Sequence, residues 1–205
     1  MPEISFFLKG IIIGFSIAAP VGPIGVLCIK RTLNEGRVYG LVSGLGAATA
    51  DAIYGSIGGF GLTFISNFLI DQQDWIRIIG GIFLCYLGVK TFLTKPASQV
   101  SISNGYGRAK AYASAFLLTI TNPITILSFA AIFAGLGLGS LNKNYISAAM
   151  LIAGVFTGSA LWWFVLSTGI SVFRGKFDQR RLQWTNRASA VILVSFGIFA
   201  FLSLI

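Results

Sequence analysis

The stretch Ala19-Pro20-Val21-Gly22-Pro23-Ile24 interrupts an apolar run that extends from Ile4 to Ile29. Each proline removes a backbone donor from a helix, and its ring clashes with the preceding turn. A helix that begins near residue 4 should therefore break at this stretch and restart at Pro23. The whole run has the length of ~20 residues that a membrane-spanning helix needs. The stretch thus predicts a broken membrane span.

A second break of the same kind is predicted in the other half of the chain. Thr121-Asn122-Pro123-Ile124 lies inside the uncharged apolar run from Ala111 to Leu141. Pro23 and Pro123 stand about half a chain length apart. Matching broken helices are typical of an internal repeat. Coincidence is the alternative interpretation, because proline kinks are common in membrane helices.

Six apolar runs account for most of the chain of 205 residues. They cover residues 4–29, 38–70, 75–93, 111–141, 145–173 and 188–205. Hydrophobic residues make up 55% and charged residues 10% of the chain, against about 25% charged residues in soluble domains. This composition disfavours soluble enzymes, nucleic-acid-binding proteins, secreted domains and disordered chains. The runs do not alternate as barrel strands would, so we predict an all-α membrane protein with six transmembrane helices.

The organisation of the six helices follows from their number. Three helices in each half must give the halves opposite orientations, so we predict two inverted three-helix repeats with their first and fourth helices broken at proline. Residues 1–205 would form one transmembrane domain, with halves of about 1–95 and 108–205. The polar segment 95–108, which contains Pro, Ser and Gly, is predicted to be a cytoplasmic linker.

The positive charges predict the orientation in a bilayer. Connections on one side of a six-helix arrangement contain twelve basic residues, and those on the other side contain three, namely Lys9, Arg77 and Lys143. Cytoplasmic loops are enriched in Lys and Arg. We therefore expect a multi-pass protein of the cell membrane with both termini outside the cytoplasm. The twelve residues are Lys30, Arg31, Arg37, Lys90, Lys95, Arg108, Lys110, Arg174, Lys176, Arg180, Arg181 and Arg187.

Of the six acidic residues in the sequence, Asp51 is the one that lies well inside an apolar run. An Asp at the centre of a membrane helix costs roughly 3 kcal/mol on insertion scales, so it normally faces a cavity or a partner. Thr49 and Tyr54 are near enough in sequence to offer hydrogen bonds. The functional hypothesis is a proton-, cation- or substrate-binding carboxylate. The alternative is a structural acid that is hydrogen-bonded between helices.

The two predicted breaks are candidate sites for an anionic group. A helix that restarts after Pro20, Gly22 and Pro23, or after Asn122 and Pro123, presents backbone N–H groups and a positive dipole end. Such an end suits the carboxylate of a substrate near the centre of the membrane. The alternative interpretation is a kink that serves packing alone.

Small residues predict close helix packing rather than chemistry. Gly36, Gly40 and Gly44 form one ladder of the second predicted helix and Gly55 and Gly59 form another, and Gly154 and Gly158 form a third in the fifth. Ladders of this spacing let two backbones approach closely. We expect the ladder of the fifth helix to pack against those of the second.

Metal, cofactor and enzymatic chemistry are not indicated. The chain has no His, and its two cysteines, Cys28 and Cys85, lie in separate apolar runs without a zinc or redox spacing. His is the commonest catalytic base and metal ligand. We predict no catalytic residues, no metal site and no cofactor.

The sequence resembles that of the LysE/RhtB superfamily of amino-acid exporters over essentially the whole chain. The resemblance lies in residues 19–23, the glycine-rich second helix with 48–54, Leu87-Gly88 and Thr121-Asn122-Pro123. It implies a secondary transporter that exports amino acids or related small molecules and is driven by the proton gradient. The implied partners are an amino acid and the lipid bilayer, with no nucleic acid; homo-oligomerisation is left open.

Two other functions remain open at this point. One is a membrane redox or assembly protein, which a dry and tightly packed centre would favour. The other is a metal-ion exporter of the same superfamily, which the absence of His and of a second intramembrane acid disfavours. A polar cavity around Asp51, Asn122 and the proline breaks would favour the amino-acid exporter.

Overall fold

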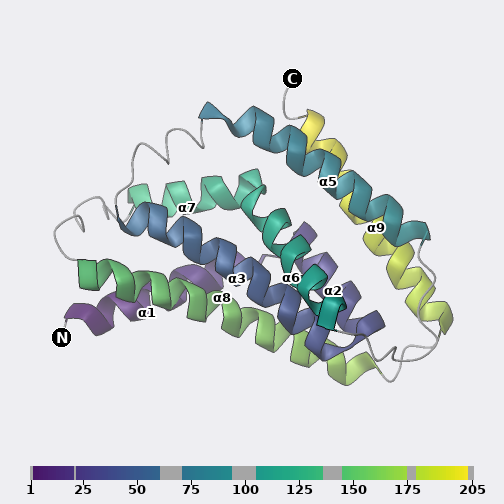
Figure 1. The fold of residues 1–205 in the computed structure, drawn as a ribbon, viewed down its shortest axis with the longest axis horizontal. Helices are drawn as coiled ribbons and strands as arrows, with labels where there is room; N and C mark the ends of the chain where they lie inside the picture. Colours follow the sequence, from purple (N-terminus) through teal and green to yellow (C-terminus); the bar gives the residue numbers. More distant parts are fainter. Residues whose placement is uncertain are drawn as a thin grey trace.

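Eight α-helices make up the described part of the chain, with no strand among them (Figure 1). The computed structural model describes residues 2–20, 22–60, 71–93, 105–135, 145–174 and 179–202. The helices are α1 (Pro2–Ala18), α2 (Pro23–Glu35), α3 (Arg37–Gly59), α5 (Gln73–Leu93), α6 (Gly105–Ile120), α7 (Pro123–Gly135), α8 (Tyr145–Arg174) and α9 (Gln179–Leu202). The prediction of an all-α protein is confirmed for these residues.

Both predicted breaks are present. The chain bends by 80° between α1 and α2 and by 59° between α6 and α7. Helix α2 begins at Pro23 and α7 begins at Pro123. Proline is favoured at the first position of a helix, where its missing N–H would have no partner anyway. The prolines therefore end one helix and start the next.

Among the described residues, three helices are long and apolar enough to cross a membrane, and the number rises to five if each bent pair is one span. The three are Asp74–Leu93, Tyr145–Phe173 and Gln183–Leu202. Helix α3 has 23 residues but is not among them, because its glycines, serines and Asp51 lower its hydropathy. It lies inside the helix assembly, where a helix needs less apolar surface than one facing lipid. The prediction of six spans thus stays a prediction.

Several predicted boundaries need correction. Helix α9 begins at Gln179 rather than at residue 188. Its first turns are helical but polar, so a boundary placed where the apolar residues begin came too late in the sequence. Helix α3 ends at Gly59, and residues 61–70 of the second predicted run lie outside the described residues. Of the predicted linker 95–108, residues 95–104 also lie outside them, whereas residues 105–108 form the first turn of α6.

Helices of the two halves pack against each other. Helix α1 packs along α8, α3 along both α6 and α8, and α5 along α9 (Figure 1). Helix α2 contacts α3, α8 and α9. The buried core formed by these contacts includes Leu27, Leu118 and Leu193, which come from α2, α6 and α9.

The glycine ladder of α8 has a different partner from the one predicted. A Cβ on Gly154 would lie 2.9 Å from the Cα of Gly10, and one on Gly158 would lie 2.9 Å from the Cα of Ile11. The ladder therefore packs against α1, in which Gly10 and Gly14 approach the α8 backbone equally closely. The expectation that it faces the glycines of α3 is wrong, because Gly44 of α3 instead contacts the Trp163 side chain.

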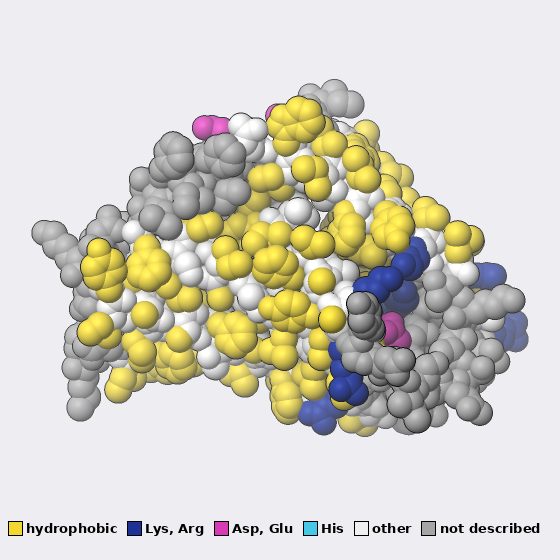
Figure 2. Space-filling view, in the orientation of Figure 1, with side chains coloured by type: hydrophobic (Ala, Val, Ile, Leu, Met, Phe, Trp, Pro, Cys, Tyr) yellow, Lys and Arg dark blue, Asp and Glu magenta, His cyan; other side chains and the backbone are white. Residues whose placement is uncertain are grey.

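The outer surface is largely apolar, as expected for a protein in contact with lipid. Helix α5 exposes Trp75, Ile79, Ile82, Tyr86 and Leu93 by more than half of their surface. On the face shown in Figure 2, hydrophobic side chains cover most of the molecule and Lys and Arg gather at its right-hand end. That end contains the end of α2, the start of α3, the end of α5 and the start of α6 (Figure 1).

Candidate functional site

A cavity of about 360 Å³ lies where the two helix breaks meet. Five of the eight predicted site residues line it: Pro20, Gly22, Pro23, Asp51 and Asn122. Segments from α1, α2, α3, α6, α7, α8 and α9 all contribute to the wall. The structure thus brings together the acid of α3 and both proline breaks, which lie far apart in the sequence.

Asp51 is buried, with only 3% of its surface exposed. Its Oδ2 accepts a hydrogen bond of 2.7 Å from the Ser159 hydroxyl, and the Trp163 indole donates to the same hydroxyl at 3.1 Å. Within the described residues no Lys or Arg forms an ion pair with Asp51. The acid thus borders the cavity without a cation to balance a negative charge.

Thr49 and Tyr54 do not line this cavity, and neither is the donor to Asp51. The Thr49 hydroxyl donates to the Leu45 carbonyl and accepts a hydrogen bond from the Tyr112 hydroxyl. The Tyr54 hydroxyl donates to the carbonyl of Ile120, the last residue of α6. Tyr54 therefore caps a carbonyl that the break leaves without a helical partner. The interpretation of both as neighbours that hydrogen-bond to Asp51 is wrong.

The two restarting helices differ at their first turns. Gly22 precedes α2 and provides no side-chain cap, and Pro23 has no N–H. In contrast, Asn122 caps α7, since its Oδ1 accepts from the Ile124 N–H at 3.2 Å. The Asn122 amide also donates to the Thr125 hydroxyl at 3.0 Å. The α2 start therefore has no side-chain cap, whereas a side chain already occupies the α7 start.

Several polar side chains of this site are not predicted by the sequence. Ser16, Thr119, Thr125 and Ser128 line the cavity, and Ser159 supports Asp51 from behind. A Ser four residues before a Trp in an otherwise apolar run was an available signal for the Ser159–Trp163 pair, because residues four apart share a helix face. The hydroxyls of the other helices give no comparable signal.

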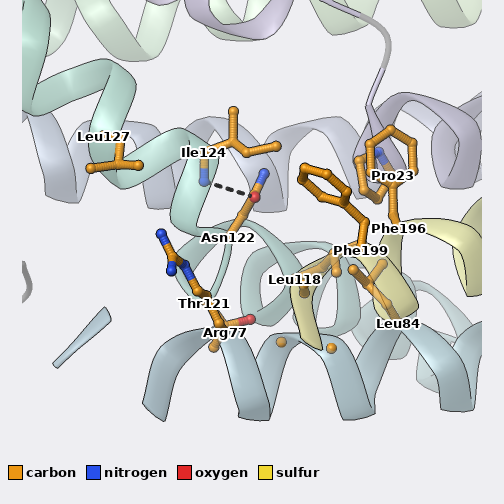
Figure 3. A pocket seen from close by; sticks show the side chains of 13 residues that line it. Pro23, Arg77, Leu84, Leu118, Thr121, Asn122, Ile124, Leu127, Phe196 and Phe199 are labelled. Carbon is orange, nitrogen blue, oxygen red and sulfur yellow. Dashed lines mark hydrogen bonds between the residues drawn. The ribbon is translucent and has the colours of Figure 1, made fainter. Parts of the chain in front are cut away.

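Figure 3 shows a second cavity of about 230 Å³. It adjoins the first, because the two share lining residues. Pro23, Asn122, Ile124 and Phe196 line both cavities. The remaining wall of the second cavity is mostly apolar and comes from α5, α6, α7 and α9. In Figure 3, Arg77 and Thr121 lie on one side of it and the two phenylalanines on the other.

At the basic end, side chains of α2 tie the halves together. Arg31 donates to the Ser43 hydroxyl and the Ala111 carbonyl, each at 2.8 Å, and to the Ser114 hydroxyl at 2.6 Å. Asn34 donates to Asn186 of α9 at 2.8 Å. These bonds hold α2 to α3, α6 and α9 at the end of the molecule where the cations gather.

The sequence of the chain matches that of a known protein family. The family model of the LysE type translocator matches residues 15–204. The chain belongs to the LysE type translocator family. The match covers both proline breaks, Asp51 and the cavity walls described above, and it confirms the resemblance seen in the sequence. The family is one of translocators. The apolar helices of this chain fit a multi-pass membrane protein.

Three relatives illustrate the similarity of this translocator to known proteins. It is 29% identical to the "Putative amino acid efflux protein YcgF" of Bacillus subtilis, over 95% of this chain and 94% of that protein. It is 26% identical to the arginine exporter protein ArgO of Salmonella paratyphi B, over 80% of this chain and 77% of that protein. It is 21% identical to the threonine efflux protein of Escherichia coli K12, over 89% and 90% of the two chains. No solved structure matches the chain significantly.

Proposed function

We propose that this translocator exports amino acids from the cytoplasm as a secondary transporter driven by the proton gradient. Family membership supports export, and the names of the relatives point to amino acids. The observation that carries the proposal is Asp51, a buried acid without a paired cation in the described residues, at a cavity between two helix breaks. A buried charge needs a partner of opposite sign, and an ammonium group or a proton can supply it.

The proposed binding mode follows from the two charges of an amino acid. Asp51 receives either the α-ammonium group or the coupled proton. The α-carboxylate faces the start of α2, which has no side-chain cap and carries the positive end of the helix dipole. The capped start of α7 contributes through Asn122 and its polar neighbours. When Asp51 binds the ammonium group, such a site leaves no charge of the substrate unpaired.

The six-span inverted repeat is part of the same proposal. If α1–α2, α3 and α5 form one half and α6–α7, α8 and α9 the other, the packing is reciprocal. The first helix of each half packs against the second helix of the other half, as α1 does on α8 and α6 on α3. The third helices, α5 and α9, pack against each other. Exchange of contacts between halves is what a pseudo-twofold axis produces.

We further propose that the basic end of the molecule faces the cytoplasm. This assignment follows the preference of Lys and Arg for cytoplasmic loops and places both termini outside. The hydrogen bonds of Arg31 and Asn34 then lie on the cytoplasmic side of the cavity. An inverted repeat is expected to open and close access on the two sides in turn.

The test is efflux from proteoliposomes loaded with labelled amino acids. With an inward-directed proton gradient we expect efflux well above that of loaded vesicles without the protein. A protonophore should abolish the increase in efflux that the gradient causes. Efflux at a rate that does not depend on the proton gradient would refute proton coupling but not the export function. Absence of efflux for every amino acid, in vesicles that contain folded protein, would refute the export function.

The competing functions fit the site less well. A redox relay through thiols is disfavoured because Cys28 and Cys85 are both free cysteines, on α2 and α5. A metal-ion exporter is disfavoured because the described residues that line the cavity include a single acid, Asp51. Hard cations prefer several oxygen ligands. A cavity with an acid and several hydroxyl groups in its wall also differs from the dry centre that an assembly protein would have.

A further inference from the structure

We infer that the second cavity holds the side chain of the exported amino acid and selects apolar, uncharged side chains over cationic ones. The inference rests on the proposed function and names its substrate class. It starts from the juxtaposition of two unlike cavities on either side of Pro23, Asn122, Ile124 and Phe196. Both linings are mostly apolar, but the first cavity contains the acid and several hydroxyl groups, whereas the second has fewer polar groups and no acid among its described lining residues.

The size of the second cavity suits part of a solute. Pockets that enclose a whole ligand have volumes of about 300–1,000 Å³. The Asp51 cavity lies in this range at about 360 Å³, whereas the second cavity lies below it at about 230 Å³. A small cavity that adjoins a larger one containing an acid fits an amino acid whose charged head group occupies the larger cavity and whose side chain occupies the smaller one.

The chemistry of the wall favours an apolar side chain. The apolar residues of the wall include Leu84, Leu118, Phe196, Phe199 and Ala200, and Figure 3 labels the first four. Leu84 and Leu118 are buried, and all five come from helices that also form the protein core. Burial of an apolar side chain against such a surface is favourable in proportion to the area removed from water.

The charges of the wall disfavour a cationic side chain. Arg77 lines the second cavity, and its side chain is only 20% exposed. Its ion-pair partner Asp74, at 3.5 Å, has a side chain that is 70% exposed and is not part of the wall. Across both cavities Asp51 is the one acid among the described lining residues, and the α-ammonium or the proton already requires it. The second charge of lysine or arginine would remain unpaired beside Arg77, which is costly.

The experiment compares efflux of leucine, alanine, lysine and arginine from the same proteoliposomes. We expect leucine efflux at least about tenfold faster than lysine or arginine efflux, because an unpaired buried charge is rejected strongly. Efflux of lysine or arginine at the leucine rate would overturn the inference and leave the export function standing. If no amino acid is exported, the proposed function itself fails and the inference falls with it.

Two variants locate the selectivity in this cavity. Ala200→Leu fills the cavity, so the leucine-to-alanine efflux ratio should fall about tenfold. The matched control is Ala188→Leu, which lies exposed on the same helix and should keep the wild-type ratio. An unchanged ratio in Ala200→Leu would overturn the inference.

Arg77→Gln provides a second test that does not depend on filling the core. Removing the cation should raise the ratio of lysine to leucine efflux at least about fivefold, since like charges no longer face each other. Arg180→Gln, an exposed change on α9, serves as the charge-matched control. If Ala200→Leu fails to insert, this ratio decides the question, and no change in it would overturn the inference.

Discussion

Ser159 on α8 donates a hydrogen bond of 2.7 Å to Oδ2 of Asp51 on α3, although 108 residues separate them in the chain. Trp163, one turn further along α8, donates to the Ser159 hydroxyl at 3.1 Å. The three side chains form a relay in which α8 fixes the position of a carboxylate that belongs to α3. The proposed coupling residue is therefore held by the half of the chain that does not contain it.

Replacement of Asp51 by Asn should reduce efflux at least about tenfold, which corresponds to ~1.4 kcal/mol. The change keeps the size and the polarity of the side chain but removes the charge that binds an ammonium group or a proton. Asp51→Glu should be milder, because it keeps the carboxylate with a longer reach. Initial efflux rates at several external pH values, normalised to protein in the membrane, provide the measurement. Wild-type export by Asp51→Asn at every pH would make Asp51 a structural acid.

Ser159→Ala should lower efflux severalfold and destabilise the protein. The variant leaves an oxygen of Asp51 and the Trp163 indole without their shared partner, and an unsatisfied buried group costs about 1–3 kcal/mol. The matched control is Ser171→Ala on the same helix, where the hydroxyl donates only to the Thr168 carbonyl. Thermal unfolding in detergent and efflux rates should both separate the two variants. Equal behaviour would show that Ser159 does not position the carboxylate.

Gly158→Ala should destabilise the α1–α8 contact, whereas Gly169→Ala should not. A Cβ on Gly158 would lie 2.8 Å from the carbonyl carbon of Ile11, but one on Gly169 would meet no atom within 4 Å. Overpacking of this kind costs about 1–3 kcal/mol, or roughly 2–4 °C of melting temperature per kcal/mol for a chain of this size. Both residues lie on α8, so helix propensity affects the two variants alike. Equal melting temperatures would contradict the close approach.

Arg31→Lys should destabilise the protein more than Arg37→Lys does, because it loosens the helix contacts at the basic end. The Arg31 guanidinium donates to three acceptors on α3 and α6 at once, and an ammonium group cannot reproduce this fork. Arg37 is exposed and lies over the Phe164 ring, where it makes no comparable set. We expect a lower melting temperature for Arg31→Lys by several degrees. Indistinguishable melting curves would show that the cluster contributes nothing measurable.

The proposed orientation predicts the behaviour of reporter fusions. A reporter that is active only outside the cytoplasm should be active when fused after Ile205 and inactive when inserted in the segment 95–108. The opposite pattern would show that the basic end faces outward. Expression of both fusions at comparable levels in membranes provides the control.

The sequence alone determined the class of protein and the positions of both breaks. Long apolar runs with few charges indicate membrane-spanning helices, and a proline within such a run kinks or breaks the helix. These properties are local, so composition and residue type suffice to predict them. For the same reason the sequence singled out Asp51, since an acid inside an apolar run is conspicuous without knowledge of its surroundings.

Only the tertiary structure decided which residues surround that acid. Thr49 and Tyr54 are near Asp51 in sequence, yet the donor is Ser159 from the other half. Gly154 and Gly158 had several possible partners, and the backbone of α1 proved to be the one. Hydrogen-bond partners and facing glycines depend on the rotation and crossing of helices, which every side chain of the core sets together. Neighbours in space are therefore a property of the packed helices, whereas the breaks and the buried acid are properties of the chain.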